Sequence, residues 1–394
     1  MTSEWRTIRA ANFIDFNPRL SLKKGAIATK VAMDKLKPFL KKIPETEKAE
    51  FNGGAKFCNG DTIMARITPC LENGKTAYVD MLDDGEIGFG STEFIVMRAK
   101  TGVSDPQFVY YTAINPVFRN VAIKSMVGSS GRQRVQQSVL EELELSVPDL
   151  DEQRRIGAFL AGLDEKIVLN NRINDNLEQQ AQAFFQELFV DNADLEWAIG
   201  TISDLGAVVG GSTPSKAKPE YYTETGIAWI TPKDLSVNKS KFISHGENDI
   251  TELGLKNSSA TIMPEGTVLF SSRAPIGYIA VAAGEVTTNQ GFKSIVPKPE
   301  IGTAFVYYFL KHNLPIIEGM ASGSTFKEVS GNTMKGVPAV IPDTDTIARF
   351  NDFCSPIFAQ QRILEEQNQS LAALRDNLLP KLMSGEIDVS DIQL

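Results

Sequence analysis

Residues 147–189 read VPDLDEQRRIGAFLAGLDEKIVLNNRINDNLEQQAQAFFQELF, and this stretch decides the fold because residues 341–383 repeat it without a gap as IPDTDTIARFNDFCSPIFAQQRILEEQNQSLAALRDNLLPKLM. A fixed offset with matches in the same order is the sign of an internal duplication. We therefore predict that the chain contains two copies of one unit. Identical pairs include Pro148/Pro342, Asp149/Asp343, Asp151/Asp345, Arg155/Arg349, Phe159/Phe353, Asn174/Asn368, Leu177/Leu371 and Leu188/Leu382.

Shorter landmarks outside this stretch recur in the same order. The string FVYY at Phe108–Tyr111 returns at Phe305–Tyr308, and the glycine turn at Gly128–Ser130 returns at Gly323–Thr325. The duplication divides the chain into four expected segments, which are residues 1–146, 147–195, 196–340 and 341–394.

Segments 147–195 and 341–394 are predicted to be long helices that pair with each other. Apolar residues recur at a seven-residue spacing, which is typical of a coiled-coil seam. The seam of the first helix has two rows, Ile156, Leu163, Asn170, Leu177 and Phe184, and then Leu160, Ile167, Asn174, Ala181 and Leu188. The second copy places Phe350, Ile357, Leu364, Leu371 and Leu378 on the equivalent row.

Asn174 and Asn368 occupy matching positions in these seams. A buried Asn fixes the register of paired helices, because sliding would leave its amide unpaired. The alternative is a seam that is open to solvent at its middle. A helix of about 39 residues is on the order of 58 Å long. Such a rod can hold two domains apart by about one DNA turn, ~34–36 Å, or somewhat more.

Capping and helix-breaking residues indicate where these helices begin and end. Asp149 or Asp151 is expected to cap the first helix. Pro356 is expected to start or kink the second helix, and Pro380 with Gly385 is expected to end it.

Segments 1–146 and 196–340 are predicted to be mixed α+β domains. Short runs of β-type residues alternate with Gly, Pro and Asn turns, and helical stretches flank them near residues 108–121 and 305–310. The clearest expected strands are Thr62–Ala65, Phe94–Met97, Thr267–Phe270 and Tyr278–Val281.

The formal net charge of −9 is distributed unevenly along the chain. Residues 147–196 carry −7 and residues 341–394 carry −5, whereas residues 1–146 carry +3 and residues 197–340 are neutral. Phosphate contacts need Lys and Arg, so the two acidic segments are excluded as a DNA-facing surface. The two mixed domains remain available for that role.

Several other classes of protein are disfavoured. The sequence begins without the apolar run of a signal peptide, and we expect no segment that spans a membrane. The three cysteines lack CxxC spacing, so we expect a reducing, cytoplasmic environment without disulfides. The two histidines, His245 and His312, lie near no cysteine pair, so no metal site is expected.

No catalytic motif stands out in the sequence. Gly74–Thr76 resembles the end of a P-loop, but Pro69 stands where the first glycine of that motif must be. The nucleophile-elbow and zinc-protease motifs are missing from the sequence. We therefore expect no catalytic residue and no cofactor in this chain.

Two kinds of loop carry residues that suit DNA. Gly128–Arg134 contains Arg and Gln, which can bond the major-groove edges of guanine and adenine. Gly210–Lys216 is rich in glycine and hydroxyl groups, which suit phosphate oxygens. A solvated surface turn is the alternative for each loop, and Trp229 is read as a core anchor. The candidate DNA-binding residues are Arg66, Lys75, Ser129, Ser130, Arg132, Gln133, Arg134, Ser212, Thr213, Ser215, Lys216, Lys233, Arg273, Lys293 and Lys327.

These strings resemble the specificity subunits of type I restriction–modification systems. Val147–Arg155 and Asn170–Asn174 are similar to the central conserved region of that family, and Leu374–Ile387 is similar to its C-terminal conserved region. Thr344–Ile347 departs from the Glu-Gln run expected at the start of the second helix. The strings similar to target recognition domains are Arg66–Lys75, Ser91–Phe94, Gly131–Arg134, Gly211–Ser215 and Trp229–Leu235.

The resemblance covers essentially the whole chain and implies an α+β fold. Two mixed target recognition domains would be separated by two long helices that form an antiparallel coiled coil, with a pseudo-two-fold internal repeat. It implies a non-catalytic subunit whose domains each read one half of an asymmetric, bipartite site in double-stranded DNA.

The resemblance also implies partners. Two methyltransferase subunits would bind S-adenosylmethionine, and motor–nuclease subunits would use ATP and Mg²⁺. Two other hypotheses remain, a stand-alone sequence-specific DNA-binding regulator and an enzyme of unrecognised type that uses one mixed domain.

Overall fold

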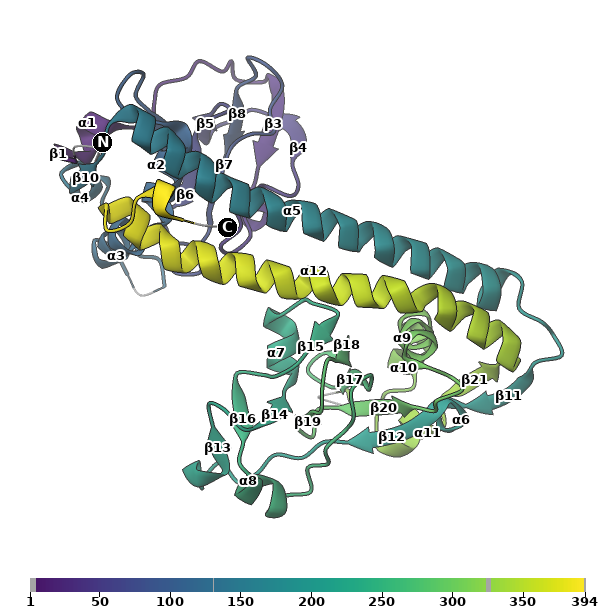
Figure 1. Cartoon of the computed structure of the whole chain (residues 1–394). Coiled ribbons are helices and arrows are strands. Elements are labelled where there is room, and N and C mark those ends of the chain that lie inside the picture. Colours follow the sequence, from purple (N-terminus) through teal and green to yellow (C-terminus); the bar gives the residue numbers. More distant parts are fainter. Residues whose placement is uncertain (1–4, 130, 324–326, 393–394) are drawn as a thin grey trace. The chain divides into compact units, whose positions relative to one another are not determined.

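The computed structural model describes residues 5–129, 131–323 and 327–392, and it divides the chain into two compact units (Figure 1). Unit 1 comprises residues 1–168 and 369–394, and unit 2 comprises residues 169–368. Both boundaries fall inside the long helices. Each unit therefore contains one mixed domain together with part of each helix, a division that differs from the four expected segments.

The two long helices are α5 (Leu150–Gln186), which a π-helical turn at Glu187–Asp191 extends, and α12 (Thr344–Ser384). Asp149 caps α5 by accepting a hydrogen bond from the backbone N–H of Glu152 at 2.9 Å. Asp343 caps α12 by accepting one from the N–H of Thr346 at 2.8 Å. The duplicated aspartate therefore starts both helices, although the residues that follow it differ.

The expectation that Pro356 starts the second helix is wrong. α12 begins at Thr344 and continues without interruption through Pro356 and Pro380. It ends at Ser384, and Gly385 follows with a φ of +76°. A proline removes one hydrogen bond of a helix. Here Phe350 and Ile357 pack in the core of unit 2, on both sides of Pro356 in the sequence, and this packing holds the helix together.

In unit 2, α5 and α12 run in opposite directions. Asn170 of α5 contacts Asn368 of α12. Phe184, which follows Asn170 in α5, stacks on Phe350, which precedes Asn368 in α12, with ring centroids 6.0 Å apart. Asn170 is fully buried, and its Nδ2 donates to Oδ1 of Asn368 at 2.9 Å. Asn174 is half-buried and lies one turn further along. The buried asparagine that pairs with Asn368 is therefore Asn170, whereas Asn174 was the expected register residue.

In unit 1, the beginning of α5 packs against the end of α12. Ile156 and Leu160 share one apolar core with Leu379 and Leu382. The seam residues expected from the seven-residue spacing are therefore buried at this end of the pair.

Unit 1 is built around two four-stranded sheets, with strand orders β2-β9-β6-β7 and β4-β3-β8-β5. A third, two-stranded sheet pairs β1 with β10. The strands are β1 (Arg6–Arg9), β2 (Ile14–Phe16), β3 (Ile27–Val31), β4 (Glu47–Glu50), β5 (Ala55–Phe57), β6 (Thr62–Ala65), β7 (Thr76–Tyr78), β8 (Gly88–Gly90), β9 (Phe94–Ala99) and β10 (Glu144–Val147). The short helices are α1 (Ala10–Phe13), η1 (Met33–Lys35), α2 (Pro106–Ile114), α3 (Pro116–Lys124) and α4 (Gln137–Glu141), and η4 (Val389–Asp391) follows α12.

Unit 2 contains a five-stranded sheet, β12-β20-β17-β18-β15, a four-stranded sheet, β13-β16-β14-β19, and the pair β11–β21. The strands are β11 (Ala198–Thr201), β12 (Gly206–Gly210), β13 (Tyr222–Thr223), β14 (Ile227–Ile230), β15 (Phe242–Ile243), β16 (Asn248–Ile250), β17 (Val268–Ser272), β18 (Ile276–Ala282), β19 (Thr287–Thr288), β20 (Lys293–Pro297) and β21 (Pro338–Ile341). The short helices are α6 (Ile202–Leu205), η3 (Pro219–Tyr221), α7 (Pro232–Val237), α8 (Glu252–Lys256), α9 (Thr303–His312), α10 (Leu314–Gly319) and α11 (Gly331–Lys335).

The two units repeat the same plan, which confirms the predicted duplication. β1 pairs with β10 from Arg6↔Val147 onward, and β11 pairs with β21 in the same register from Ala198↔Ile341. The FVYY strings lie on α2 and α9, where their aromatic rings are buried. Among the described residues, no helix is long and apolar enough to cross a membrane, and no group of three or more His, Cys, Asp or Glu side chains could hold a metal ion.

Candidate nucleic-acid interface

A hairpin in unit 1 presents the arginines of the Gly128–Arg134 loop. Val127 and Arg134 pair across it, and the buried Val135 donates its backbone N–H to the carbonyl oxygen of Arg66 at 2.8 Å. The tip bends at Gly128 and Gly131, whose φ angles are +135° and +77°. Positive φ is the conformation that glycine adopts at least cost. Ser130, one of the expected DNA-binding residues, lies outside the described residues.

The candidate side chains of this hairpin have different environments. Arg134 is engaged with Glu93, and its Nη2 lies 2.6 Å from Oε1 of that carboxylate. Arg132 is exposed and makes no side-chain hydrogen bond or ion pair with the part of the chain that is described. Ser129 is exposed, and Gln133 is half-buried, with its backbone N–H on Oγ1 of Thr68 at 3.0 Å.

Arg66 and Lys75 are less available than the sequence suggested. Arg66 is half-buried and donates from Nη2 to the carbonyl oxygen of Val135 at 3.3 Å, although it also lines a hollow of about 560 Å³. Lys75 donates from Nζ to the carbonyl oxygen of Met33 at 2.9 Å. Lys75 therefore binds the backbone at the start of η1.

Unit 2 builds the equivalent hairpin with the opposite charge. Ser322 and Glu328 pair across it, and the following Val329 donates its backbone N–H to the carbonyl oxygen of Ser272 at 3.0 Å. Glu328 thus occupies the place of Arg134. It lies 3.3 Å from Nη1 of Arg273 and 3.6 Å from Nζ of Lys293, both of which were candidate residues. The candidate Lys327 is exposed beside it.

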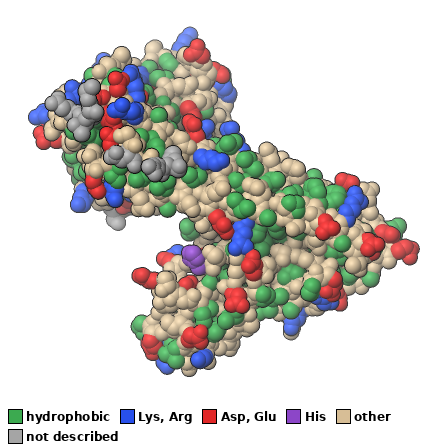
Figure 2. Space-filling model, in the orientation of Figure 1, with side chains coloured by type: hydrophobic (Ala, Val, Ile, Leu, Met, Phe, Trp, Pro, Cys, Tyr) green, Lys and Arg blue, Asp and Glu red, His purple; other side chains and the backbone are tan. Residues whose placement is uncertain are grey.

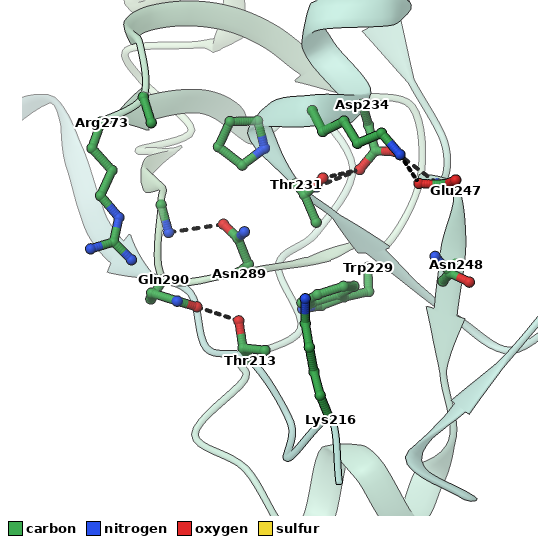
Figure 3. Close-up of a pocket in the computed structure, with 14 residues that line it drawn as sticks. Thr213, Lys216, Trp229, Thr231, Asp234, Glu247, Asn248, Arg273, Asn289 and Gln290 are labelled. Carbon is green, nitrogen blue, oxygen red and sulfur yellow. Dashed lines mark hydrogen bonds and ion pairs between the residues drawn. The ribbon is translucent and has the colours of Figure 1, made fainter. Parts of the chain in front are cut away.

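A cleft of about 490 Å³ brings Arg273 together with three further candidates of unit 2 (Figure 3). The three are Thr213, Lys216 and Lys233. Figure 3 shows Lys216 and Trp229 on one side of the cleft and Arg273 on the other.

The four side chains differ in how free they are. Lys216 is exposed and has no side-chain hydrogen bond or ion pair among the described residues, whereas Nζ of Lys233 is 2.6 Å from Oε2 of Glu247. Thr213 donates its hydroxyl hydrogen to the amide oxygen of Gln290. Among the described residues, Lys216 is therefore a lysine of this cleft whose charge has no protein partner. Arg273 makes one contact, with Glu328, and its other N–H donors are available.

The loop that carries Ser212 and Ser215 is held at both ends, because Tyr222 donates its hydroxyl hydrogen to the carbonyl oxygen of Pro214 at 2.6 Å. The backbone N–H of Ser212 donates to Thr288 at 2.8 Å, and its carbonyl oxygen accepts a bond from Nε1 of Trp229 at 3.0 Å. Ser215 is exposed. Trp229 is 6% exposed, as expected for a core anchor.

Asn248, Asn289 and Gln290 line the same cleft and were missed by the sequence reasoning. Isolated amides give no periodic or motif signal. Asn248 begins β16 whereas Asn289 and Gln290 follow β19, and they meet because β14 lies between these two strands. Their amide groups can donate and accept hydrogen bonds, which suits the edges of bases.

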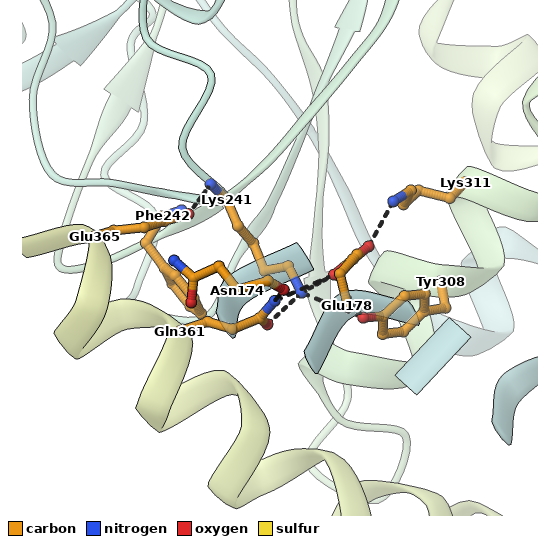
Figure 4. Close-up of polar contacts among 8 residues, drawn as sticks. All are labelled: Asn174, Glu178, Lys241, Phe242, Tyr308, Lys311, Gln361 and Glu365. Carbon is orange, nitrogen blue, oxygen red and sulfur yellow. Dashed lines mark hydrogen bonds and ion pairs between the residues drawn. The ribbon is translucent and has the colours of Figure 1, made fainter. Parts of the chain in front are cut away.

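A buried lysine joins the domain of unit 2 to its helices (Figure 4). Nζ of Lys241 donates to Oε1 of Gln361 at 2.6 Å and lies 2.5 Å from Oε2 of Glu178. Lys311 and the hydroxyl group of Tyr308 also contact Glu178, at 2.6 and 2.8 Å. Burial raises the pKa of Glu178, but the two lysines outweigh it and hold that pKa at about 2.

Unit 1 contains a chemically similar cluster around Lys41. Its Nζ donates to the hydroxyl oxygen of Tyr111 at 3.2 Å, and that hydroxyl donates to Asp164 of α5 at 2.6 Å. Tyr111 and Tyr308 come from the repeated FVYY strings, yet both acids, Asp164 and Glu178, come from α5. The two clusters therefore share the lysine and the tyrosine. Their acids, Asp164 and Glu178, do not occupy equivalent positions in the two copies of the repeat.

Charge on the surface is mixed. Figure 2 shows Lys and Arg side chains interspersed with Asp and Glu over the face in view. Among the described side chains on that face no broad basic patch forms.

The chain belongs to the family of type I restriction–modification DNA specificity domains, which it matches over residues 36–179 and again over residues 194–374. The double match follows the internal repeat. The family is that of specificity subunits, which are not themselves catalysts.

Named relatives agree with this placement. The chain is 39% identical over 191 residues to the type I restriction enzyme MjaIX specificity subunit of Methanocaldococcus jannaschii, a match that covers 46% of this chain and 44% of that protein. It is 25% identical over 407 residues to the HindI specificity subunit of Haemophilus influenzae, covering 83% and 86%. The solved S subunit from M. genitalium has the same fold, with a TM-score of 0.59, 18% identity and 96% of each chain covered.

Proposed function

We propose that each unit reads one half of an asymmetric, bipartite site in double-stranded DNA. The observation that carries this proposal is the repeated hairpin at the end of β6 and β17. In both units the residue that follows the hairpin donates its backbone N–H to a carbonyl oxygen at the end of β6 or β17, and the hairpin presents Arg134 in unit 1 and Glu328 in unit 2. One scaffold with different side chains suits two half-sites of different sequence.

The long helices serve as the spacer and the docking element in this proposal. The chain's net negative charge lies in the segments that contain them, so they are unsuited to phosphate contact. Two methyltransferase subunits that bind S-adenosylmethionine would dock here, and motor–nuclease subunits that use ATP and Mg²⁺ would join them in the cytoplasm. The chain itself would supply sequence recognition alone.

Mapping adenine methylation in a host with and without this gene tests the proposal. We expect one split motif to lose its methylation when the gene is deleted. Retention of every split motif would contradict the proposed function.

A gel-shift measurement separates the subunit from a stand-alone regulator. The full chain should bind its site tightly only together with the methyltransferase subunits. Tight, sequence-specific binding by the chain alone would favour the regulator.

A further inference from the structure

The guanidinium group of Arg134 is held along one edge. Its Nε lies 2.9 Å from Oε2 of Glu93, and its Nη2 lies 2.6 Å from Oε1. A guanidinium carries five N–H donors in a plane. The edge formed by Nη1 and Nη2 therefore keeps two parallel donors, for which the described residues provide no acceptor. Two parallel donors match the O6 and N7 acceptors of guanine in the major groove.

Glu93 is itself fixed to the scaffold. Its carbonyl oxygen accepts the backbone N–H of Arg66 at 2.9 Å, and its own N–H donates to Oγ of Ser91 at 3.1 Å. The Arg134 side chain is 46% exposed, whereas that of Glu93 is 24% exposed. The acid therefore lies behind the arginine, and its contacts with Arg134 lower its pKa and keep it charged.

A carboxylate behind an arginine changes what the arginine recognises. It fixes the plane of the fork, so less side-chain entropy is lost on binding. It also offsets the positive charge, which weakens attraction to phosphates of any sequence. Both effects favour contact with a base over contact with the backbone.

Unit 2 also pairs an arginine with a carboxylate at this hairpin, but the charges are exchanged and the contact is a single one, from Nη1 of Arg273 to Oε2 of Glu328 at 3.3 Å. Glu328 stands at the hairpin position, and Arg273 comes from the loop after β17. Lys293, at the start of β20, approaches the same carboxylate. Arg273 lines the cleft of Figure 3 and keeps donors beyond its contact with Glu328.

We propose that Glu93 and Glu328 are positioning residues that orient Arg134 and Arg273, and that each arginine reads a guanine in the half-site of its own unit. This inference rests on the proposed function. It separates Arg134 and Arg273 from Arg132 and Lys216, which have no such carboxylate and would contact phosphates.

The test measures binding of the full chain, assembled with its methyltransferase subunits, to DNA libraries varied one base pair at a time. Glu93→Ala should reduce the preference for one G·C pair of one half-site by roughly tenfold. It should leave affinity for non-specific DNA equal or higher, because a negative charge is removed. Arg134→Ala should abolish preference at the same base pair, and Glu328→Ala should act on the other half-site.

Glu47→Ala is the matched control. Glu47 is an exposed acid of unit 1 that pairs with Lys30 and, within the described part of the chain, makes no contact with Arg134. This variant removes the same charge and should keep the wild-type preference. Glu93→Asp, which keeps the carboxylate, should restore part of the preference lost in Glu93→Ala.

Wild-type discrimination in Glu93→Ala, or a uniform loss of affinity for all sequences, would overturn the positioning role. Failure of the proposed function would look different, because the unmodified assembly would then show no preference at any base pair of a split site.

Discussion

Nη1 of Arg375 on α12 lies 2.6 Å from Oδ1 of Asp164 on α5, and both side chains are largely buried, with exposed fractions of 11% and 8%. Asp164 also accepts the hydroxyl hydrogen of Tyr111, so one carboxylate joins both helices to the domain of unit 1. We predict that Arg375→Met lowers the free energy of unfolding by about 3–5 kcal/mol, because it leaves Asp164 buried without its cation. Urea unfolding of the full chain measures the change.

Arg154→Met is the control for this prediction. Arg154 pairs with Asp151 on the same helix at 2.9 Å, but both side chains are mostly exposed. Exposed pairs contribute about 0–1 kcal/mol. Equal destabilisation by the two substitutions would contradict the role given to the buried pair.

The buried lysine of unit 1 predicts an unusual dependence of stability on pH. Burial lowers the pKa of Lys41 from 10.5 to about 8. Between these values the unfolded chain binds more protons than the folded chain, so stability rises with pH across this window. Below pH 8 both states are protonated and the dependence vanishes. Above pH 10, Tyr110 and Tyr111 act in the opposite direction, because burial raises the pKa of each.

Comparing urea unfolding at pH 8 and pH 9.5 checks this prediction. From pH 8 to pH 9.5, the free energy of unfolding of the unmodified chain should rise by about 1–2 kcal/mol more than that of Lys41→Met. Lys42→Met, at the neighbouring position with a more exposed side chain, should behave as the unmodified chain does. An identical pH profile in Lys41→Met would show that Lys41 does not titrate in this range.

Asn170 has a buried amide oxygen without a hydrogen-bond partner among the described residues. Its counterpart in the second copy is Leu364, which is also buried. We predict that Asn170→Leu raises the free energy of unfolding by about 1–2 kcal/mol, because an unsatisfied polar group is replaced by an apolar one. Thermal or urea unfolding measures the change. A loss of stability would mean that the hydrogen bond with Asn368 stabilises the fold more than the unpaired amide oxygen of Asn170 destabilises it.

The two lysines of the Figure 3 cleft should affect DNA binding differently. Lys216 has no partner among the described residues, so Lys216→Ala should weaken DNA binding about equally for all sequences. The slope of log K against log salt concentration should fall by about 1, as expected for the loss of one phosphate contact. Lys233 is paired with Glu247, so Lys233→Ala should have a smaller effect. DNA-binding titrations of the assembled complex at several salt concentrations measure both effects. A change of sequence preference in Lys216→Ala would refute the assignment of Lys216 to a phosphate.

The sequence predicts the fold well where the pattern is periodic or repeated. The seam residues Ile156, Leu160 and Phe350 are buried as expected, and the predicted strand Thr62–Ala65 coincides with β6. The start of α12 could not be derived from its prolines, since packing on both sides of Pro356 carries the helix through it.

The candidate site is less predictable, because side chains far apart in the sequence decide which cations are free. Glu93 takes one edge of Arg134, and a backbone carbonyl takes Lys75. No local pattern encodes these pairings. The sequence also does not show that Lys41 and Lys241 form similar clusters. The acids of these clusters, Asp164 and Glu178, do not match each other in the repeat.

The central claim is that each unit reads its own half of the site. The most direct measurement is sequencing of the methylated motif in hosts that carry the unmodified chain, Arg134→Ala or Arg273→Ala together with the methyltransferase subunits. We predict that Arg134→Ala relaxes one half of the motif and Arg273→Ala relaxes the other, with the spacing unchanged. A single substitution that alters both halves would contradict the account.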